Sequence, residues 1–375
     1  MKKILVLGCG MVGRAIVKDM AKDYVVKVMD ISKENLSKLK NTDSIKKIRA
    51  DATDLKTLRR HANDSDLLIS AVPGFLGFKV LKNIIKCKKN VVDISFFGGD
   101  AFELNKLAKK NKVTAIVDCG VAPGLSNIIL GYHNSRMKIN SFECMVGGLP
   151  EKREWPYQYK APFSPIDVIE EYTRPSRIVK NGKIIVKEAL SDTEILNIEP
   201  VGELEAFNTD GLRSLLKTMK IPNMTEKTLR YPGHTELIKV LRESGFFSDK
   251  KVNVNGNKIS PLEMTTRLLF PIWKLGDEEE EFTVLKIKIS GTEDEKKICY
   301  EYSLYDKFDR KTKVSSMART TGYTCTAVAR LVLEGKFLQK GICPPEFIGA
   351  LQANFEGVID DLEKRRIHIT RKVIK

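Results

Sequence analysis

The N-terminal part of the chain alternates short apolar runs with segments in which apolar residues recur at helical spacing. Lys3–Leu7 is dominated by an unbroken apolar run, typical of a strand buried on both faces of a parallel sheet. The segment from Val12 to about Lys22 repeats apolar residues every three or four positions, which predicts a helix with one face on that sheet. The same alternation predicts further strands at Val25–Met29, Ile45–Ala50, Asp66–Ala71, Val91–Ile94 and Val113–Asp118, and helices at Asp54–Ala62, Lys79–Cys87 and Asp100–Asn111. Strands alternating with helices predict an α/β fold with an N-terminal Rossmann domain, a doubly wound parallel sheet.

Beyond Ser141 the pattern changes from strand-helix alternation to hairpins. Two Asn-Gly turns between β-rich segments predict tight hairpins, and two longer alternating segments are expected to pair antiparallel. The hairpins are Ile178–Ile185 and Val252–Ile259; the longer pair is Phe282–Ser290 with Ile298–Tyr305, joined by the loop Gly291–Lys297. The second half is therefore expected to be an α+β domain with an open, mainly antiparallel sheet.

The chain becomes helical again from about Ser315 to Glu334, and Gly335 follows in the place of a helix C-cap. We expect this helix to return to the first domain. The predicted organisation is an N-terminal domain of residues 1–125, completed by C-terminal helices at about 315–375, and a second domain of residues 126–314.

Composition describes an ordinary globular protein, with 42% hydrophobic and 30% charged residues over 375 positions. No apolar run approaches the roughly 20 residues that cross a bilayer, and the start lacks the long apolar stretch of a signal peptide, so we expect a cytoplasmic protein with no membrane contact. Seven scattered cysteines without C-x-x-C spacing indicate reduced thiols and no metal site. The net charge of +16 comes mainly from lysine. It forms no basic cluster with interleaved aromatics, so we expect no nucleic-acid partner.

The first predicted strand leads into a glycine turn, Gly8-Cys9-Gly10-Met11-Val12-Gly13, and then into a helix. In a dinucleotide-binding turn the first glycine permits the tight bend, the second lets the backbone approach a pyrophosphate, and the third lets helix and strand pack closely. The N–H groups of the helix start, around Met11 and Val12, would face the phosphates. A glycine turn that binds nothing is the alternative.

Asp30 ends the second predicted strand, about 20 residues after Gly8, where a ribose-binding carboxylate belongs. A carboxylate accepts hydrogen bonds from the ribose hydroxyls and repels a 2′-phosphate, so the sequence favours NAD over NADP as the cofactor. Lys33 keeps NADP open as the second possibility.

Further cofactor contacts are expected where the other parallel strands end. Asp51 and Ala52 close the third strand, where the adenine usually lies; a turn beside a helix is the alternative for Asp51. Val72 and Pro73 close the fourth strand, beside the nicotinamide half. Gly120, after the last predicted strand of this region, completes the set.

Several strings spread along the chain resemble the saccharopine dehydrogenase-like family, and within it the L-lysine 6-dehydrogenase branch. They are Gly120–Gly124, Val146–Pro150, Leu204–Phe207, Arg230–His234, and Met317–Arg319 with Tyr323-Thr324. Their order is that of the family and they span nearly the whole chain. One departure is informative, because saccharopine reductases carry an Asp where this chain has Ala122, and the lysine 6-dehydrogenase pattern has Ala-Pro-Gly there.

The resemblance implies NAD-dependent oxidation of L-lysine at the ε-carbon, giving allysine or 1-piperideine-6-carboxylate, ammonia and NADH. A saccharopine- or carboxyspermidine-type dehydrogenase, which joins an amine to a carbonyl compound, is the alternative. A non-catalytic NAD-binding sensor or scaffold is a second alternative. The partner expected for domain 126–314 is a small amino-acid substrate, and an open sheet with an apolar face makes this domain the expected site of a homodimer contact.

The chemistry needs a base for the substrate ammonium and a cation for its carboxylate. His234 is a candidate acid or base, or else a histidine that stabilises its turn. Arg230 is a candidate carboxylate ligand, or else the partner of a structural acid. Asp93, at the end of a strand on the cofactor side, is the best-placed candidate base.

Asp118 and Asp210 are further candidate bases. For each of the three acids, including Asp93, capping of a helix is the alternative. Lys160 would suit an acidic substrate if it points inward, although a lysine is more often solvated. Arg319 and Tyr323 are expected either to support the nicotinamide side or to pack the returning helix.

Overall fold

The structure is a computed structural model in which residues 1–374 are described. The chain divides into two compact units: the first comprises Met1–Arg136 and Ala318–His368, and the second comprises Met137–Met317 and the chain from Ile369 onward. The first unit extends beyond residue 125 because α6 (Leu125–Asn134) packs on α12 (Pro345–Gly349) of the same unit. The last strand, β18 (Ile369–Ile374), pairs with β16 (Lys296–Lys307) of the second unit, so the chain end does not complete the first one as the sequence suggested.

The first unit is built on a seven-stranded sheet whose neighbouring strands all run parallel, in the order β17-β6-β5-β4-β1-β2-β3. The strands are β1 (Lys3–Leu7), β2 (Val25–Asp30), β3 (Ile45–Arg49), β4 (Leu67–Ser70), β5 (Val91–Asp93), β6 (Thr114–Ile116) and β17 (Gly341–Cys343). This order confirms the predicted doubly wound sheet. Successive strands are added toward one edge from β1 to β3 and toward the other edge from β4 onward. Ligands of such sheets bind at this switch point, here between β1 and β4, outside the carboxyl ends of the strands. Strand β17 was not predicted, because three residues are too few to show a period.

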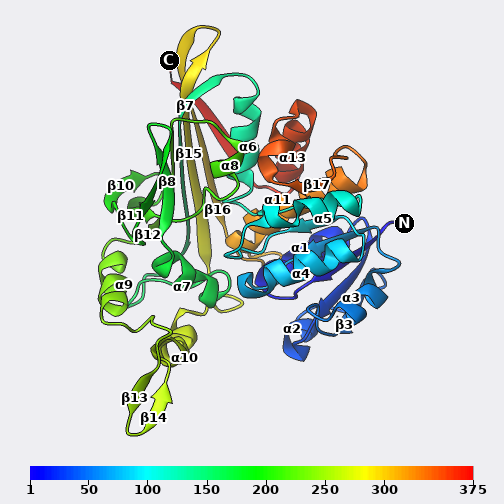
Figure 1. Cartoon of the computed structure of the whole chain (residues 1–375), viewed down its shortest axis with the longest axis horizontal. Coiled ribbons are helices and arrows are strands. Elements are labelled where there is room, and N and C mark those ends of the chain that lie inside the picture. The colour runs from blue at the N-terminus through cyan, green and yellow to red at the C-terminus, as the bar shows by residue number, and fades with distance from the viewer. Residues whose placement is uncertain (375) are drawn as a thin grey trace. The chain divides into compact units, whose positions relative to one another are not determined.

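Helices connect these strands (Figure 1). They are α1 (Met11–Met20), α2 (Lys33–Ser37), α3 (Leu55–Ala62), α4 (Gly74–Lys86), the 3₁₀ turn η1 (Ala101–Leu104), α5 (Asn105–Lys110), α6, α11 (Ser316–Leu333), α12 and α13 (Gln352–Lys364). The start of α3 is set by Asp54, whose carboxylate accepts from Thr57 N at 2.9 Å. The predicted helix at Asp100–Asn111 is divided into η1 and α5, and α11 agrees with its predicted span, followed by Gly335 at a φ of 74°.

The second unit contains a nine-stranded mixed sheet, with the main order β10-β11-β12-β7-β15-β16-β18 and with β8 and β9 attached beside β12. Its strands are β7 (Lys138–Pro150), β8 (Ser176–Lys180), β9 (Lys183–Lys187), β10 (Glu194–Ile198), β11 (Gly202–Asn208), β12 (Asn223–Arg230), β15 (Glu281–Glu293), β16 and β18. Only the β12–β7 pair is parallel, so the expectation of a mainly antiparallel sheet is confirmed.

Strands β15 and β16 are longer at their hairpin end than the sequence suggested. The loop expected at Gly291–Lys297 is a two-residue turn, Asp294-Glu295, with φ values of 47° and 63°. Such φ values are typical of the tight turn that matches strand twist, but glycine or asparagine usually marks it. The turn was therefore not predicted, because Asp294-Glu295 lacks these residues.

The remaining elements of this unit are α7 (Pro165–Thr173), α8 (Leu215–Thr218), α9 (His234–Glu243), α10 (Pro261–Trp273) and a separate two-stranded hairpin of β13 (Val252–Val254) and β14 (Asn257–Ile259). Each unit has its own hydrophobic core: the first gathers around Leu5, Leu68 and Ile84, and the second around Phe207, Leu229 and Trp273. Within residues 1–374, no helix combines the length and apolar character needed to cross a membrane.

Candidate functional site

Two glycines of the turn after β1 are required by close backbone packing. Gly8 has a φ of 96°, and a Cβ added to it would lie 2.3 Å from the carbonyl oxygen of Ala71, after β4. A Cβ on Gly13 would lie 2.2 Å from the carbonyl oxygen of Gly8. Both distances are far inside van der Waals contact, so these glycines hold β1, β4 and α1 together.

Gly10 differs from both, because no atom lies within 4 Å of a Cβ built on it. It is the N-cap of α1, and neither a capping side-chain bond nor an acidic residue occupies the first turn, which begins at Met11 and Val12. A side chain at Gly10 would fill the volume above the helix N-terminus, where N–H groups bind a phosphate. The turn thus fits a dinucleotide pyrophosphate.

Asp30, the last residue of β2, lies against this turn. Its Oδ2 accepts from the backbone N of Cys9 at 2.6 Å, and its Oδ1 accepts from the N of Ser32 at 2.7 Å. Each carboxylate oxygen has two lone pairs, so both keep capacity for a sugar hydroxyl. Arg49 is the register partner of Asp30 on β3, and Lys33 begins α2, so cations lie in the same region.

The other sequence-predicted cofactor residues follow β3, β4 and β6. Asp51 is exposed and binds Thr53 through both oxygens, at 2.7 Å to its N and 2.9 Å to its Oγ1, which is the turn geometry anticipated as the alternative for it. Ala52 is nearly buried beside it. Val72 and Pro73 lead into α4, with Pro73 as its N-cap. Gly120 is buried, and its N donates to Pro123 O at 3.0 Å.

Asp93 ends β5 and is fully buried. Its Oδ1 accepts from the N of Ser95 at 2.9 Å and from the Ser95 hydroxyl at 2.6 Å, while its Oδ2 is buried with no hydrogen-bond partner among the described residues. Burial raises the pKa of Asp93 to about 7 against the opposing bonds from Ser95, and the nearby charge of Asp118 raises it further. This carboxyl group can gain or lose a proton near neutral pH.

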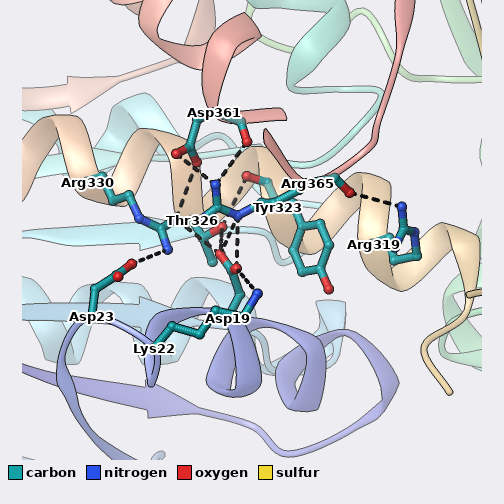
Figure 2. Close-up of polar contacts among 9 residues, drawn as sticks. All are labelled: Asp19, Lys22, Asp23, Arg319, Tyr323, Thr326, Arg330, Asp361 and Arg365. Carbon is teal, nitrogen blue, oxygen red and sulfur yellow. Dashed lines mark hydrogen bonds and ion pairs between the residues drawn. The ribbon is translucent and has the colours of Figure 1, made fainter. Parts of the chain in front are cut away.

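A polar network that the sequence did not predict joins α1 to α11 and the end of α13 (Figure 2). Asp19 of α1 is completely buried and accepts from Thr326 at 2.7 Å, from Arg330 at 3.1 Å and from Nε of Arg365 at 2.9 Å. Burial alone would raise the pKa of Asp19, but the two guanidinium groups and the hydroxyl lower it below its usual value. The network ties the C-terminal helices to the helix that presents the glycine turn.

The same network extends along α11. Arg330 also pairs with Asp23 and Asp361, at 3.0 and 3.3 Å. Arg319 donates to the carbonyl oxygens of Arg365 and Arg366 (Figure 2). Tyr323 is buried, and its ring centre lies 5.7 Å from the guanidinium carbon of Arg319. Packing of the returning helix, the second of the two roles considered for Arg319 and Tyr323, accounts for these contacts. Neighbours more than 300 residues apart in sequence leave no local signal from which they could have been found.

In the second unit, Arg230 is the last residue of β12 and is buried, and each of its three guanidinium nitrogens donates a hydrogen bond. It donates to the Tyr172 hydroxyl at 3.1 Å, to Leu229 O at 2.9 Å, to the Tyr159 hydroxyl at 3.3 Å and to Glu171 at 2.7 Å. The ring of Tyr159 also lies 4.4 Å from the guanidinium carbon. This is the ion pair with a structural acid that the sequence left open for Arg230. Glu171 and the two tyrosines were missed because nothing in their spacing links them to it.

His234 begins α9 inside the same cluster. Its Nδ1 lies 2.9 Å from Tyr157 O, which can only accept, so this nitrogen carries the hydrogen. Its Nε2, at 2.9 Å from the Tyr172 hydroxyl, then accepts, and that hydroxyl oxygen accepts from Arg230. Burial lowers the pKa of His234 to about 3, with the charge of Arg230 as the second cause. A neutral imidazole with both nitrogens engaged holds its neighbours in place and cannot take up a proton near pH 7.

The last two candidate residues are also engaged. Lys160 lies 3.8 Å from Glu154 and 3.5 Å from Glu279. Asp210 is buried and is held by Arg177 through its N, Nε and Nη2 at 3.1, 2.8 and 2.7 Å. Across residues 1–374, no group of three or more His, Cys, Asp or Glu side chains is arranged to hold a metal ion.

Comparison with known proteins accounts for both units. Residues 4–116 match the family model of the saccharopine dehydrogenase NADP binding domain, and residues 120–367 match that of the saccharopine dehydrogenase C-terminal domain. The saccharopine dehydrogenase [NADP(+), L-glutamate-forming] of Pyricularia oryzae is 29% identical over 266 residues, which are 67% of this chain. The match spans 59% of the length of that relative.

Solved structures show the same fold. The apo saccharopine dehydrogenase (L-Glu forming) of Saccharomyces cerevisiae superposes with a TM-score of 0.80 at 22% identity, covering 100% of both chains. The homospermidine synthase of Legionella pneumophila, solved in complex with NAD, gives 0.68 at 12% identity, covering 100% of this chain and 91% of its own. The two family models together cover almost the whole sequence, and the chain therefore belongs to the saccharopine dehydrogenase family.

Proposed function

We propose that this protein is an NAD-linked dehydrogenase that oxidises the CH–NH bond of a small amino-acid amine. The observation that carries the proposal is the turn at Gly10, which is open above the N-terminus of α1 and has Asp30 beside it. The relatives of the chain are named as dehydrogenases, which supports a reaction rather than binding alone.

The choice of NAD depends on Asp30. A carboxylate accepts from both ribose hydroxyls and repels a 2′-phosphate at the same place. The curated relatives are named for NADP(+), and Lys33 and Arg49 lie near Asp30, so the two cofactors have to be compared directly. Titration of the purified protein with each is expected to give the lower Kd for NAD; a lower Kd for NADP would overturn this part of the proposal.

We propose L-lysine as the substrate, oxidised at the ε-carbon. When bound, the cofactor accepts the hydride from that carbon. The protein must hold the amino acid and take up the proton released from its ε-ammonium group. Water then hydrolyses the imine, so that lysine, NAD and water give allysine, ammonium, NADH and a proton, and the aldehyde can cyclise. Support for lysine comes from Ala122, which stands where saccharopine reductases carry an Asp.

For the proton we propose Asp93 as the acceptor. It lies at the carboxyl end of β5, its Oδ2 has no partner among the described residues, and its pKa is raised to about 7 by burial. The base form is present above that pH, so oxidation is expected to rise with pH through about 7 and then to level off.

Asp93→Asn should lower kcat by roughly 10²- to 10⁴-fold, the usual contribution of a general base, and remove this limb of the pH profile. Asp64→Asn, a change at an exposed carboxylate of the same unit, serves as the matched control. If Asp93→Asn keeps both the rate and the pH limb, Asp93 is not the acceptor of the proton from the substrate ammonium.

Oxidative cleavage of saccharopine, or of a related secondary amine, is the second candidate, and the names of the relatives favour it. The deciding experiment follows NADH absorbance and ammonia with L-lysine, with saccharopine, and in reverse with an amine plus a carbonyl compound. NADH and ammonia from lysine alone support the first candidate. Turnover of saccharopine without ammonia release supports the second, and NAD binding without turnover of any amine supports a sensor or scaffold.

A further inference from the structure

Lys160 is a partly buried cation of the second unit that faces two carboxylates at long range. Its side chain is 19% exposed, and its Nζ lies 3.5 Å from Glu279 Oε1 and 3.8 Å from Glu154 Oε2. A hydrogen bond between an ammonium and a carboxylate is normally about 2.7–2.9 Å long. Lys227, whose side chain is 11% exposed, does form a direct bond of this kind, to Glu194. The Lys160 ammonium has three donors, so it can still bind another oxygen acceptor at shorter range.

The backbone on both sides of Lys160 is fixed. The Tyr159 side chain is buried, with its ring centre 4.4 Å from the guanidinium carbon of Arg230. Ala161 is fully buried, and its N donates to Trp273 O at 2.6 Å. These neighbours fix where the Lys160 side chain leaves the backbone, so less conformational freedom remains to be lost when a ligand binds.

The two glutamates each use one oxygen in their own turn. Glu154 Oε1 accepts from Lys152 at 2.8 Å, and Glu279 Oε2 accepts from Gly276 N at 2.5 Å. The other oxygen of each is the one that faces Lys160, and the two side chains are 44% and 43% exposed. Both facing oxygens can therefore accept from a ligand while the turns keep their own hydrogen bonds.

Oxidation of an amino-acid amine requires a cation for the substrate carboxylate. Arg230, which the sequence suggested for this role, donates from each guanidinium nitrogen to its own neighbours. Arg177 is held by both oxygens of Asp210, at 2.8 and 2.7 Å. Lys160, in contrast, has no contact as short as these with the two carboxylates that it faces.

Lys160 and its two glutamates have the charge pattern that an α-amino acid requires. Such a ligand carries a carboxylate and an ammonium group on one carbon at neutral pH. The Lys160 ammonium can donate to that carboxylate, and the facing oxygens of Glu154 and Glu279 can accept from that ammonium. The three side chains are therefore complementary to the α-carbon end of an amino acid.

We infer that these three residues bind the substrate by its α-carbon end, with Lys160 on the carboxylate and with Glu154 and Glu279 on the ammonium. The inference rests on the proposed function only in taking an α-amino acid as the substrate. It holds for L-lysine and for saccharopine alike, because both carry these two groups on one carbon. The site holds the substrate at the end remote from the ε-carbon, where the bond is oxidised.

Three ligands separate the two halves of the site in calorimetric titrations, carried out with NADH present so that no ligand is oxidised. L-Lysine has both α-groups, 6-aminohexanoate has the carboxylate without the α-ammonium, and 1,5-diaminopentane has no carboxylate. Lys160→Met should raise the Kd of L-lysine and of 6-aminohexanoate on the order of 10- to 100-fold, the usual effect of losing a charged hydrogen bond. It should not raise the Kd of 1,5-diaminopentane.

The glutamates should give the reciprocal pattern. Glu154→Gln and Glu279→Gln should each raise the Kd of L-lysine and of 1,5-diaminopentane about 10-fold and leave that of 6-aminohexanoate unchanged. The matched controls are Lys313→Met and Glu278→Gln, which break the 3.6 Å ion pair made by the residue next to Glu279, and they should change none of the three Kd values. Lys160→Arg keeps the charge and should retain most of the affinity for L-lysine.

Circular dichroism verifies that each variant is folded. A Lys160→Met protein that melts at a lower temperature but binds L-lysine normally would make the group a structural ion pair and overturn the inference. An equal loss for all three ligands overturns it as well, and so does a wild-type protein that binds neither L-lysine nor saccharopine.

These outcomes are distinct from those of the proposed reaction. Oxidation of L-lysine with an unchanged Kd in Lys160→Met would keep the reaction and remove the site. The crossed pattern of Kd values without formation of NADH would keep the site and remove the reaction.

Discussion

The glycine turn of the first unit and the Arg230–His234 cluster of the second are both conspicuous in the sequence, yet they use their residues in opposite ways. Around Gly10 the backbone leaves an open volume, and no side chain caps the N–H groups at the start of α1. Around Arg230 all three guanidinium nitrogens already donate hydrogen bonds within the protein, and His234 is neutral with both nitrogens engaged. A glycine turn leaves space and free N–H groups, so it indicates a place for a ligand. A cluster of large polar side chains can instead be part of the core, with its members hydrogen-bonded to one another.

The largest expected effect is on the folding of the second unit. Arg230→Met leaves the partly buried Glu171 without its cation and the buried Tyr172 and Tyr159 hydroxyls without a donor, which should cost about 3 kcal/mol of unfolding free energy, the low end for a broken buried pair. Urea unfolding measures this, and NAD affinity should not change. Lys187→Met, at the surface pair with Asp192, is the control and should cost less than about 1 kcal/mol. Equal costs for the two variants would mean that the buried cluster is not what holds this unit together.

The next effect separates two glycines of one turn. Gly10→Ala should leave unfolding unchanged, because its Cβ meets no atom, but should weaken NAD binding on the order of 100-fold by displacing the pyrophosphate. Gly13→Ala should destabilise the fold, because its Cβ would lie 2.2 Å from Gly8 O. Calorimetric titration and thermal unfolding of both variants give the comparison. A Gly10→Ala protein with normal NAD affinity would remove the main support for the cofactor site.

A smaller effect is expected at Asp30. Asp30→Ala removes the charged acceptor proposed for the ribose, which should cost about 1.5–3 kcal/mol of NAD binding and narrow the proposed preference for NAD over NADP. Fluorescence titration with both cofactors measures it. Asp43→Ala, at an exposed acid in the same unit, should change neither Kd.

The last effect is a change of pH dependence, which is small near neutral pH and grows as the pH falls. The pKa of His234 is lowered to about 3 in the folded chain, so the stability it contributes is fully present above about pH 6.5. That stability is lost progressively as pH falls from 6.5 toward 3, at up to about 1.4 kcal/mol per pH unit, because only the unfolded chain binds the proton. His234→Gln should flatten this slope in urea titrations between pH 7 and 5, and His368→Gln, at an exposed position, should not. An unchanged slope in His234→Gln would show that another group titrates.

The first sheet could be predicted because its signals are local. Each buried parallel strand is a short apolar run, each helix has one apolar stripe, and the glycines of the bend after β1 are adjacent in sequence to the strand and helix that they join. Predictions failed where the local signal was absent or misleading. The Asp294-Glu295 turn lacks glycine, β17 is three residues long, and the chain end joins the second unit by pairing with β16.

By itself, then, the sequence determined the doubly wound sheet, the dinucleotide turn and the mainly antiparallel second sheet, because periodicity and glycine positions act over a few residues. Only the tertiary structure decided which polar residues have partners. It united Asp19 with Arg330 and Arg365, and Arg230 with Glu171 and Tyr172, and it buried Asp93 with one oxygen lacking a partner among the described residues. The physical reason is that desolvation and pairing set the charge state of such a group, and both depend on neighbours that the chain brings together only when it folds.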